Sequence, residues 1–309
     1  MWSASRSFVT LATMLFVGEL TPSNGQAQER HVLTGDATLW NLAGDVRIEP
    51  ASGRELVVEV TRGGDDADRL SVRAEGGALR VRYPAEDIVY AHGRGRSTTT
   101  LRVRDDGTFG GGGRWGDGRQ VTVRSSGRGL DAHADLVVRV PAGRRVAVHL
   151  AAGQITAANV DGEVVLDTHS ADVAVMNGQG RWTIDTGSGD VRVEASRVTL
   201  RVDTGSGSVA LRGLSAMTDV DLDTGSGAIE ARDVVATRFA ADVGSGRVMI
   251  DGLAADALLV DSGSGSVRVS LDRMPRRTEI DTGSGRVILA VPADAGAELA
   301  IQTGSGDIT

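Results

Sequence analysis

The 309-residue chain has no cysteine and no lysine, and aromatic residues make up only 3% of it. Without cysteine there is no disulfide framework, no thiolate metal site and no cysteine nucleophile. With so few aromatics, the interior must be built from Val, Leu, Ile and Ala, which suits thin, layered packing. All 33 basic residues are arginine, they are scattered, and the formal net charge is −8. This charge balance argues against a nucleic-acid partner.

The first residues have the pattern of a secretory signal peptide. Arg6 precedes an apolar run from Phe8 to Val17, and Gly25-Gln26-Ala27 places small residues before a cleavage point at Gln28. The run is too short to span a bilayer, and no other stretch approaches that length. We expect residues 1–27 to be removed and the mature protein to reach the periplasm, the cell surface or the outside of the cell. The alternative is a buried N-terminal strand.

Residues 28–91 alternate apolar and polar side chains between glycine-rich breaks, as in Leu56 to Val60 and Leu79 to Tyr83. This period of two predicts half-buried β-strands that lead into the rest of the fold. No amphipathic helix of useful length is visible in the mature chain.

Residues 92–119 interrupt this alternation. Four consecutive glycines, Gly110 to Gly113, stand among arginines and aspartates. Such a composition buries little apolar surface, so we expect a flexible insertion outside the β framework. The alternative is a contact loop that uses Phe109, Arg114 and Trp115.

The dominant feature of the chain is a tripeptide, Gly-Ser-Gly, that recurs at intervals of 18 to 21 residues. Its seven copies start at Gly187, Gly205, Gly225, Gly244, Gly263, Gly283 and Gly304. A fixed period of this size indicates a stacked array in which each repeat is one structural unit. Degenerate copies extend the array backwards, so residues 120–309 are predicted to form it.

One repeat, residues 200–214, shows how such a unit is built. Alternation places Leu200, Val202 and Thr204 on one face, and after the glycines Val209 and Leu211 return to it. Each unit is therefore two short strands joined at a Gly-Ser-Gly corner, and successive units pair in parallel. We predict an all-β fold, a parallel β-solenoid (β-helix), whose corner glycines allow a positive φ or close contact between stacked turns. Corner Thr and Ser are expected to form hydroxyl ladders between rungs.

An aspartate precedes most corners and forms an outward-facing series. Its members are Asp185, Asp203, Asp223, Asp242, Asp261 and Asp281, with Gln302 in the last copy. Asp-Thr-Gly-Ser is also the active-site tetrapeptide of aspartic proteases, but those enzymes use a single pair of aspartates across a cleft. Two roles remain open: hydrogen bonding to the backbone of the corner as an Asx-type turn, or a weak Ca²⁺-binding edge.

No other pattern points to a catalytic, cofactor-binding or metal-binding residue. The histidines are His31, His92, His133, His149 and His169, and they share no metal-ligand spacing. We interpret them as surface residues. The serines lie in turns without the strand-to-helix context of a hydrolase nucleophile. We therefore predict no catalytic residue, no metal site and no cofactor.

The corner sequences, the segment from Leu39 to Ile48 and the closing Gly304-Ser305-Gly306-Asp307-Ile308 together resemble a bacterial family of candidate adhesins. These are exported β-strand repeat proteins whose domain has no established function. The resemblance covers nearly the whole mature chain. It implies an exported β-helical protein of the cell envelope, and it carries over no ligand and no catalytic residue.

These observations lead to one expected function and two alternatives. We expect a non-enzymatic envelope protein, an adhesin that presents a repetitive surface to an envelope protein or a glycan. One alternative is a β-helical enzyme acting on polysaccharides, for which the 92–119 segment would have to form the cleft. The other is a structural protein that self-associates through the ends of its solenoid.

Overall fold

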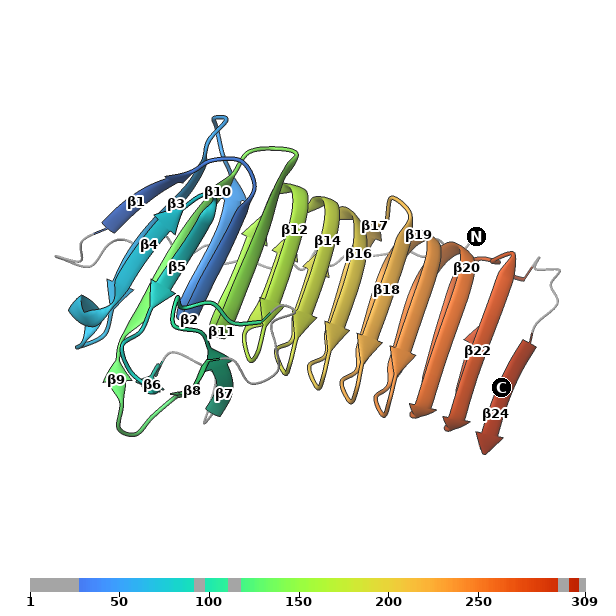
Figure 1. The fold of residues 1–309 in the computed structure, drawn as a ribbon. Coiled ribbons are helices and arrows are strands. Elements are labelled where there is room, and N and C mark those ends of the chain that lie inside the picture. Colours follow the sequence, from blue (N-terminus) through green and yellow to red (C-terminus); the bar gives the residue numbers. More distant parts are fainter. Residues whose placement is uncertain (1–27, 92–97, 111–117, 294–299, 306–309) are drawn as a thin grey trace, which may run out of the picture.

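The computed structural model describes residues 28–91, 98–110, 118–293 and 300–305. The chain is 69% strand and forms a parallel β-solenoid of about 8 turns, each about 19 residues long. Within these ranges the one helical element is a short 3₁₀ turn, η1 (Ala67–Arg69). Figure 1 shows a rod in which the strands lie across the long axis and are stacked side by side along it. The predicted fold class is therefore confirmed. The proposed signal peptide, residues 1–27, lies outside the described residues.

The strands fall into an N-terminal group, a small second sheet and the rungs. The N-terminal strands are β1 (Gln28–Leu33), β2 (Ala37–Pro50), β3 (Leu56–Gly63), β4 (Ser71–Glu75) and β5 (Ala78–Arg82). The second sheet contains β6 (Asp87–Val89), β7 (Thr98–Val103), β8 (Arg119–Arg124) and β9 (Leu130–Asp131). The chain then returns to the main sheet with β10 (His133–Val140) and β11 (Arg144–Ala158).

The rungs alternate between two parallel rows of strands. One row includes β12 (Asp161–Thr168), β14 (Gln179–Thr186), β16 (Arg197–Thr204), β18 (Asp219–Thr224), β22 (Arg277–Ser284) and β24 (Ala300–Ser305). The other includes β13 (Asp172–Met176), β15 (Val191–Glu194), β17 (Val209–Ser215), β21 (Val267–Arg273) and β23 (Val287–Ala290). The long strands β19 (Ile229–Val243) and β20 (Val248–Ser264) contribute to both rows.

The interior of the solenoid is filled by the predicted inward residues. Leu200 and Val202 are both 1% exposed, and Val209 is fully buried. Because each rung pairs in register with the next, equivalent apolar side chains stack along the rod. The alternation in the sequence thus predicted the core correctly.

The first rung comes from a segment far from the repeats. β2 pairs in parallel with β11, so that Gly44 lies opposite Gly153 and Val46 opposite Ile155. Residues 51–143 are therefore inserted between the first rung and the second. Antiparallel pairing of β3 with β1 and β10 covers that end of the rod. Residues 28–91 are predicted from their alternation to lead into the solenoid, whereas β2, which lies within them, is itself a rung.

Part of the 92–119 segment differs from the expected excursion. Residues 98–103 form β7, which pairs antiparallel with β8. Leu101, Val103 and Phe109 are buried, with Phe109 only 1% exposed. These apolar side chains supply the buried area that the glycine-rich composition appeared to lack, and they attach the second sheet to the rod. Residues 92–97 and 111–117, including Arg114 and Trp115, lie outside the described residues.

The corner glycines are required by close contact between turns. An added Cβ at Gly207 would lie 1.9 Å from the carbonyl oxygen of Gly189 in the preceding rung. Gly207 itself does not have a positive φ, so contact rather than backbone conformation decides this position. The stacked corners leave no room for a side chain at this glycine position.

The hydrogen bonds at the corners also differ from expectation. The N–H of Gly207 donates to Oγ1 of Thr204 at 2.9 Å, so the buried threonine caps its own corner rather than forming a hydroxyl ladder. Some corner hydroxyls do bond from rung to rung, but to carbonyl oxygens: Oγ1 of Thr224 donates to the carbonyl oxygen of Gly207 at 3.2 Å. The residue after the corner adds further bonds between rungs. The N–H of Ser208 donates to Oδ1 of Asp190, and the N–H of Asp190 donates to Oδ1 of Asp172, both at 2.9 Å.

Candidate functional site

One face of the solenoid carries a line of carboxylates, here called the acidic column. It consists of Asp167, Asp185, Asp203, Asp223, Asp242, Asp261 and Asp281. Each aspartate lies directly opposite the next in the strand register, so their spacing is the strand separation of about 4.8 Å. The structure adds Asp167 to the series predicted from the sequence and places Gln302 opposite Asp281.

The carboxylates of the column carry like charges at the spacing of the rungs, and the pKa of three of them is raised. Partial burial and the neighbouring charges of Asp167 and Asp203 raise the pKa of Asp185. Burial and the adjacent aspartates raise the pKa of Asp223 and Asp261 in the same way. The Asx-type role considered for these aspartates is filled at three corners by threonine, whose hydroxyl accepts the corner N–H. The column aspartates therefore face solvent as a charged series.

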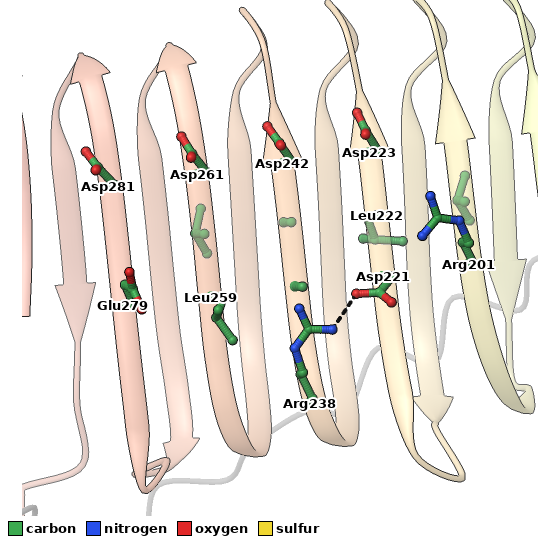
Figure 2. Close-up of a pocket in the computed structure, with 14 residues that line it drawn as sticks. Arg201, Asp221, Leu222, Asp223, Arg238, Asp242, Leu259, Asp261, Glu279 and Asp281 are labelled. Carbon is green, nitrogen blue, oxygen red and sulfur yellow. Dashed lines mark hydrogen bonds and ion pairs between the residues drawn. The ribbon is translucent and has the colours of Figure 1, made fainter.

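A shallow groove of about 350 Å³ runs beside the C-terminal half of the column. Figure 2 shows Asp223, Asp242, Asp261 and Asp281 in a row along it, with Arg238 pointing toward Asp221. The guanidinium of Arg238 donates to Oδ1 of Asp221 at 2.7 Å. This arginine is thus already paired, and the row of column carboxylates gives the groove its negative charge.

An aromatic and histidine cluster closes the N-terminal end of the column. His149 lies opposite both Trp40 and Asp167 in the register. Its Nδ1 is 2.9 Å from Oδ2 of Asp167, and its ring stacks on Trp40 with centroids 5.1 Å apart and planes 3° apart. Phe109 contacts His149 and His169 edge-on, and its carbonyl accepts a hydrogen bond from Nε1 of Trp40. The column therefore ends in a packed cluster.

The interpretation of His149 and His169 as surface residues is wrong. The side chain of His149 is only 14% exposed. Burial lowers the pKa of His169, although Asp167 and Asp185 oppose this effect. Sequence reasoning missed the cluster because Trp40, Phe109 and His149 are distant in sequence. Only the placement of His149 in the position that aspartate holds in later rungs could have indicated it.

The site offers carboxylates without a metal-binding geometry. In the part of the chain that the structure describes, no group of three or more His, Asp or Glu side chains could hold a metal ion. The aspartates lie in a single file on one sheet face, unlike the paired aspartates of a protease cleft. The arrangement can attract cationic groups along its length, at equivalent positions on successive rungs.

Comparison with known proteins agrees with this architecture. A crystallised candidate adhesin from Parabacteroides distasonis has a TM-score of 0.50 and 12% identity, covering 92% of this chain and 97% of that one. A candidate lipid-binding protein from the same organism has a TM-score of 0.40 and 14% identity, covering 93% and 97%. A candidate cell adhesion protein from Clostridium sporogenes has a TM-score of 0.25 and 8% identity, covering 80% and 100%. At these identities the first likeness concerns the fold alone.

A match to a protein family places the chain. No curated protein matches it significantly. Among the described residues, no helix is long and apolar enough to cross a membrane. The profile of the Toastrack DUF4097 family matches residues 41–216 and 198–309, which together take in all seven Gly-Ser-Gly corners and the rung formed by β2. The chain therefore belongs to the Toastrack DUF4097 family.

Proposed function

We propose that this chain is an exported, non-enzymatic protein of the cell envelope, an adhesin that binds its partner through the strand face carrying the acidic column. The observation that carries the proposal is the register of the column, which places equivalent carboxylates on successive rungs of one flat face. A repeated surface of this kind makes many weak contacts with a partner at once, rather than holding one substrate in a single pocket. Of the two Parabacteroides distasonis proteins, the one with the TM-score of 0.50 is described as a candidate adhesin, which supports the same role.

The charge of the face indicates the chemistry of the partner. Seven aspartates in a line favour a partner that carries several cationic groups, such as a basic segment of an envelope protein. A neutral glycan is less well matched, because binding of sugars relies on exposed aromatic rings. Trp40, which continues the column, is covered by Arg80 on one side and by His149 on the other. We therefore favour an envelope protein over a glycan as the partner.

A binding experiment with matched variants tests this proposal. The purified protein is added to envelope vesicles, and the bound fraction is measured for the wild type, for the double variant Asp223→Asn/Asp242→Asn and for Glu230→Gln/Asp251→Asn. The second pair removes the same charge from the other row of strands, where Asp251 lies opposite Arg232. We expect only the column variant to lose binding, and we expect the loss to grow at low ionic strength.

Three outcomes would contradict the proposal. Equal loss from both double variants would show that only net charge matters. Release of products from acidic polysaccharides would identify an enzyme instead. Association of the chain with itself, measured by light scattering and abolished together with vesicle binding, would favour the structural role.

A further inference from the structure

A second groove, beyond the N-terminal end of the acidic column, is lined by arginines. It lies between β5 and the turn that follows β7 and has a volume of about 330 Å³. Figure 1 shows these two strands at the N-terminal end of the rod. Arg69, Arg82, Arg104 and Arg119 surround it, and the apolar side chains of Leu42 and Val103 are among its lining residues. We call it the arginine groove. It brings four cations together on a chain whose net charge is −8.

Three of the four arginines are held in place by neutral groups. Nη2 of Arg82 donates to the carbonyl oxygen of Asp105 at 2.6 Å. Nε of Arg104 donates to Oγ1 of Thr108 at 2.7 Å, and Arg119 donates to the carbonyl oxygen of Tyr83. These bonds fix the guanidinium groups without neutralising them. Each guanidinium has five N–H donors, so each keeps donors beyond these contacts.

Carboxylates balance only part of this charge. Arg69 pairs with Asp66 at 3.3 Å, and among the residues that the structure describes Asp105 is the one acidic residue that lines the groove. The positive field extends to Asp106 beside the groove. Burial acts to raise the pKa of Asp106, but hydrogen bonds from Thr108 and the charges of Arg80 and Arg104 bring it below its ordinary value. The groove therefore has a net positive charge, which a bound anion would offset.

We propose that the arginine groove binds a phosphate group, carried by a lipid headgroup or by a soluble phosphorylated molecule. Planar guanidinium groups donate paired hydrogen bonds to phosphate oxygens, and several preorganised arginines match the several acceptor oxygens of one phosphate. A carboxylate has two oxygens and a single charge, and it would leave more of the four guanidiniums without a counter-charge. This proposal does not depend on the function proposed for the acidic column.

Binding of inorganic phosphate is measured by titration calorimetry on the wild type and three single variants. Arg82→Gln should weaken binding about tenfold or more, because a charge-assisted hydrogen bond and a charge are lost. Arg212→Gln removes an exposed arginine of β17 outside the groove and should leave binding unchanged. Asp105→Asn removes the carboxylate from the groove but keeps the carbonyl that holds Arg82, so it should tighten binding about threefold. A gain in affinity cannot come from misfolding.

A second arm identifies the source of the phosphate. The wild type and Arg82→Gln are sedimented with phosphatidylcholine vesicles, with and without phosphatidic acid. Binding of inorganic phosphate together with phosphatidic acid vesicles supports the groove as a lipid headgroup site, and binding of phosphate alone supports a soluble ligand. Absence of binding to both probes overturns the proposal. Equal affinity for phosphate in the wild type, Arg82→Gln and Asp105→Asn overturns it as well.

Discussion

Replacing Asp223 with asparagine removes one charge from the middle of the acidic column while keeping the size of the side chain. Asp223 lies between Asp203 and Asp242 in the strand register, so it has a like charge on either side. Its side chain is exposed to solvent. We therefore expect Asp223→Asn to stabilise the protein at neutral pH.

The size of this effect follows from the spacing of the rungs. Two unit charges about 4.8 Å apart in bulk water repel by about 0.9 kcal/mol. Physiological salt, with a screening length of about 8 Å, reduces this to about 0.5 kcal/mol for each neighbour. The two neighbours together give about 1 kcal/mol, and the charge of Arg201 offsets part of it. For a domain of this size the expected rise in Tm is about 1 to 3 °C.

The effect has a defined dependence on pH. Burial and the neighbouring aspartates raise the pKa of Asp223 in the folded protein above the ordinary value of 3.8. Between the ordinary pKa and the raised pKa of the folded protein, the folded state binds more protons than the unfolded state. Stability therefore falls as pH rises through this range. The penalty is complete at pH 7 and is absent below the ordinary pKa. Asp223→Asn should therefore raise Tm at pH 7 and have little effect at about pH 3.

Thermal unfolding followed by circular dichroism at both pH values measures this prediction. Asp251→Asn is the matched control, because Asp251 lies opposite Arg232 and its removal should not stabilise the protein. In the double variant Asp223→Asn/Asp242→Asn, the second substitution should contribute less than it does alone, since the repulsion between the two residues is already gone. A Tm of Asp223→Asn at pH 7 equal to or below that of the wild type would refute the reasoning. An equal increase at both pH values would also refute it.

Two further predictions concern the corners and are measured by denaturant unfolding. Gly207→Ala should lower the free energy of unfolding by about 3 kcal/mol or more, because the added Cβ would lie 1.9 Å from the carbonyl oxygen of Gly189. The control Gly53→Ala, whose Cβ would have no atom within 4 Å, should change this free energy by less than about 0.5 kcal/mol. Comparable losses in the two variants would contradict the contact argument. Thr204→Val should lower the free energy of unfolding by about 1 to 3 kcal/mol, because the N–H of Gly207 loses its acceptor. Val243 is the one valine at the position that Thr204 holds before its Gly-Ser-Gly corner. Val243→Thr should therefore stabilise the protein, and a loss of stability would argue against capping by the threonine hydroxyl.

The periodic part of the fold was predictable from the sequence because its signals are local. Alternation within residues 200–214 identifies the inward side chains, and the recurring glycines identify the corners. The same pattern places the column aspartates outward and in line, since equivalent residues of successive parallel rungs must stack. Capping by threonine was not predicted, because the alternation says which way Thr204 points but not which N–H its hydroxyl reaches.

The non-periodic sites depend on contacts that no local pattern encodes. β2 joins the stack by pairing in register with β11, with Gly44 opposite Gly153, across an insertion of residues 51–143. The stacking of Trp40 on His149 results from the pairing of β2 with β11, and the arginine groove forms where β5 of the insertion meets the turn after β7. The sequence by itself determined the rungs, their core and the line of aspartates, because a repeated local pattern specifies parallel stacking. The tertiary structure alone decided what closes the column and where the arginines converge, because those contacts join segments with no shared period.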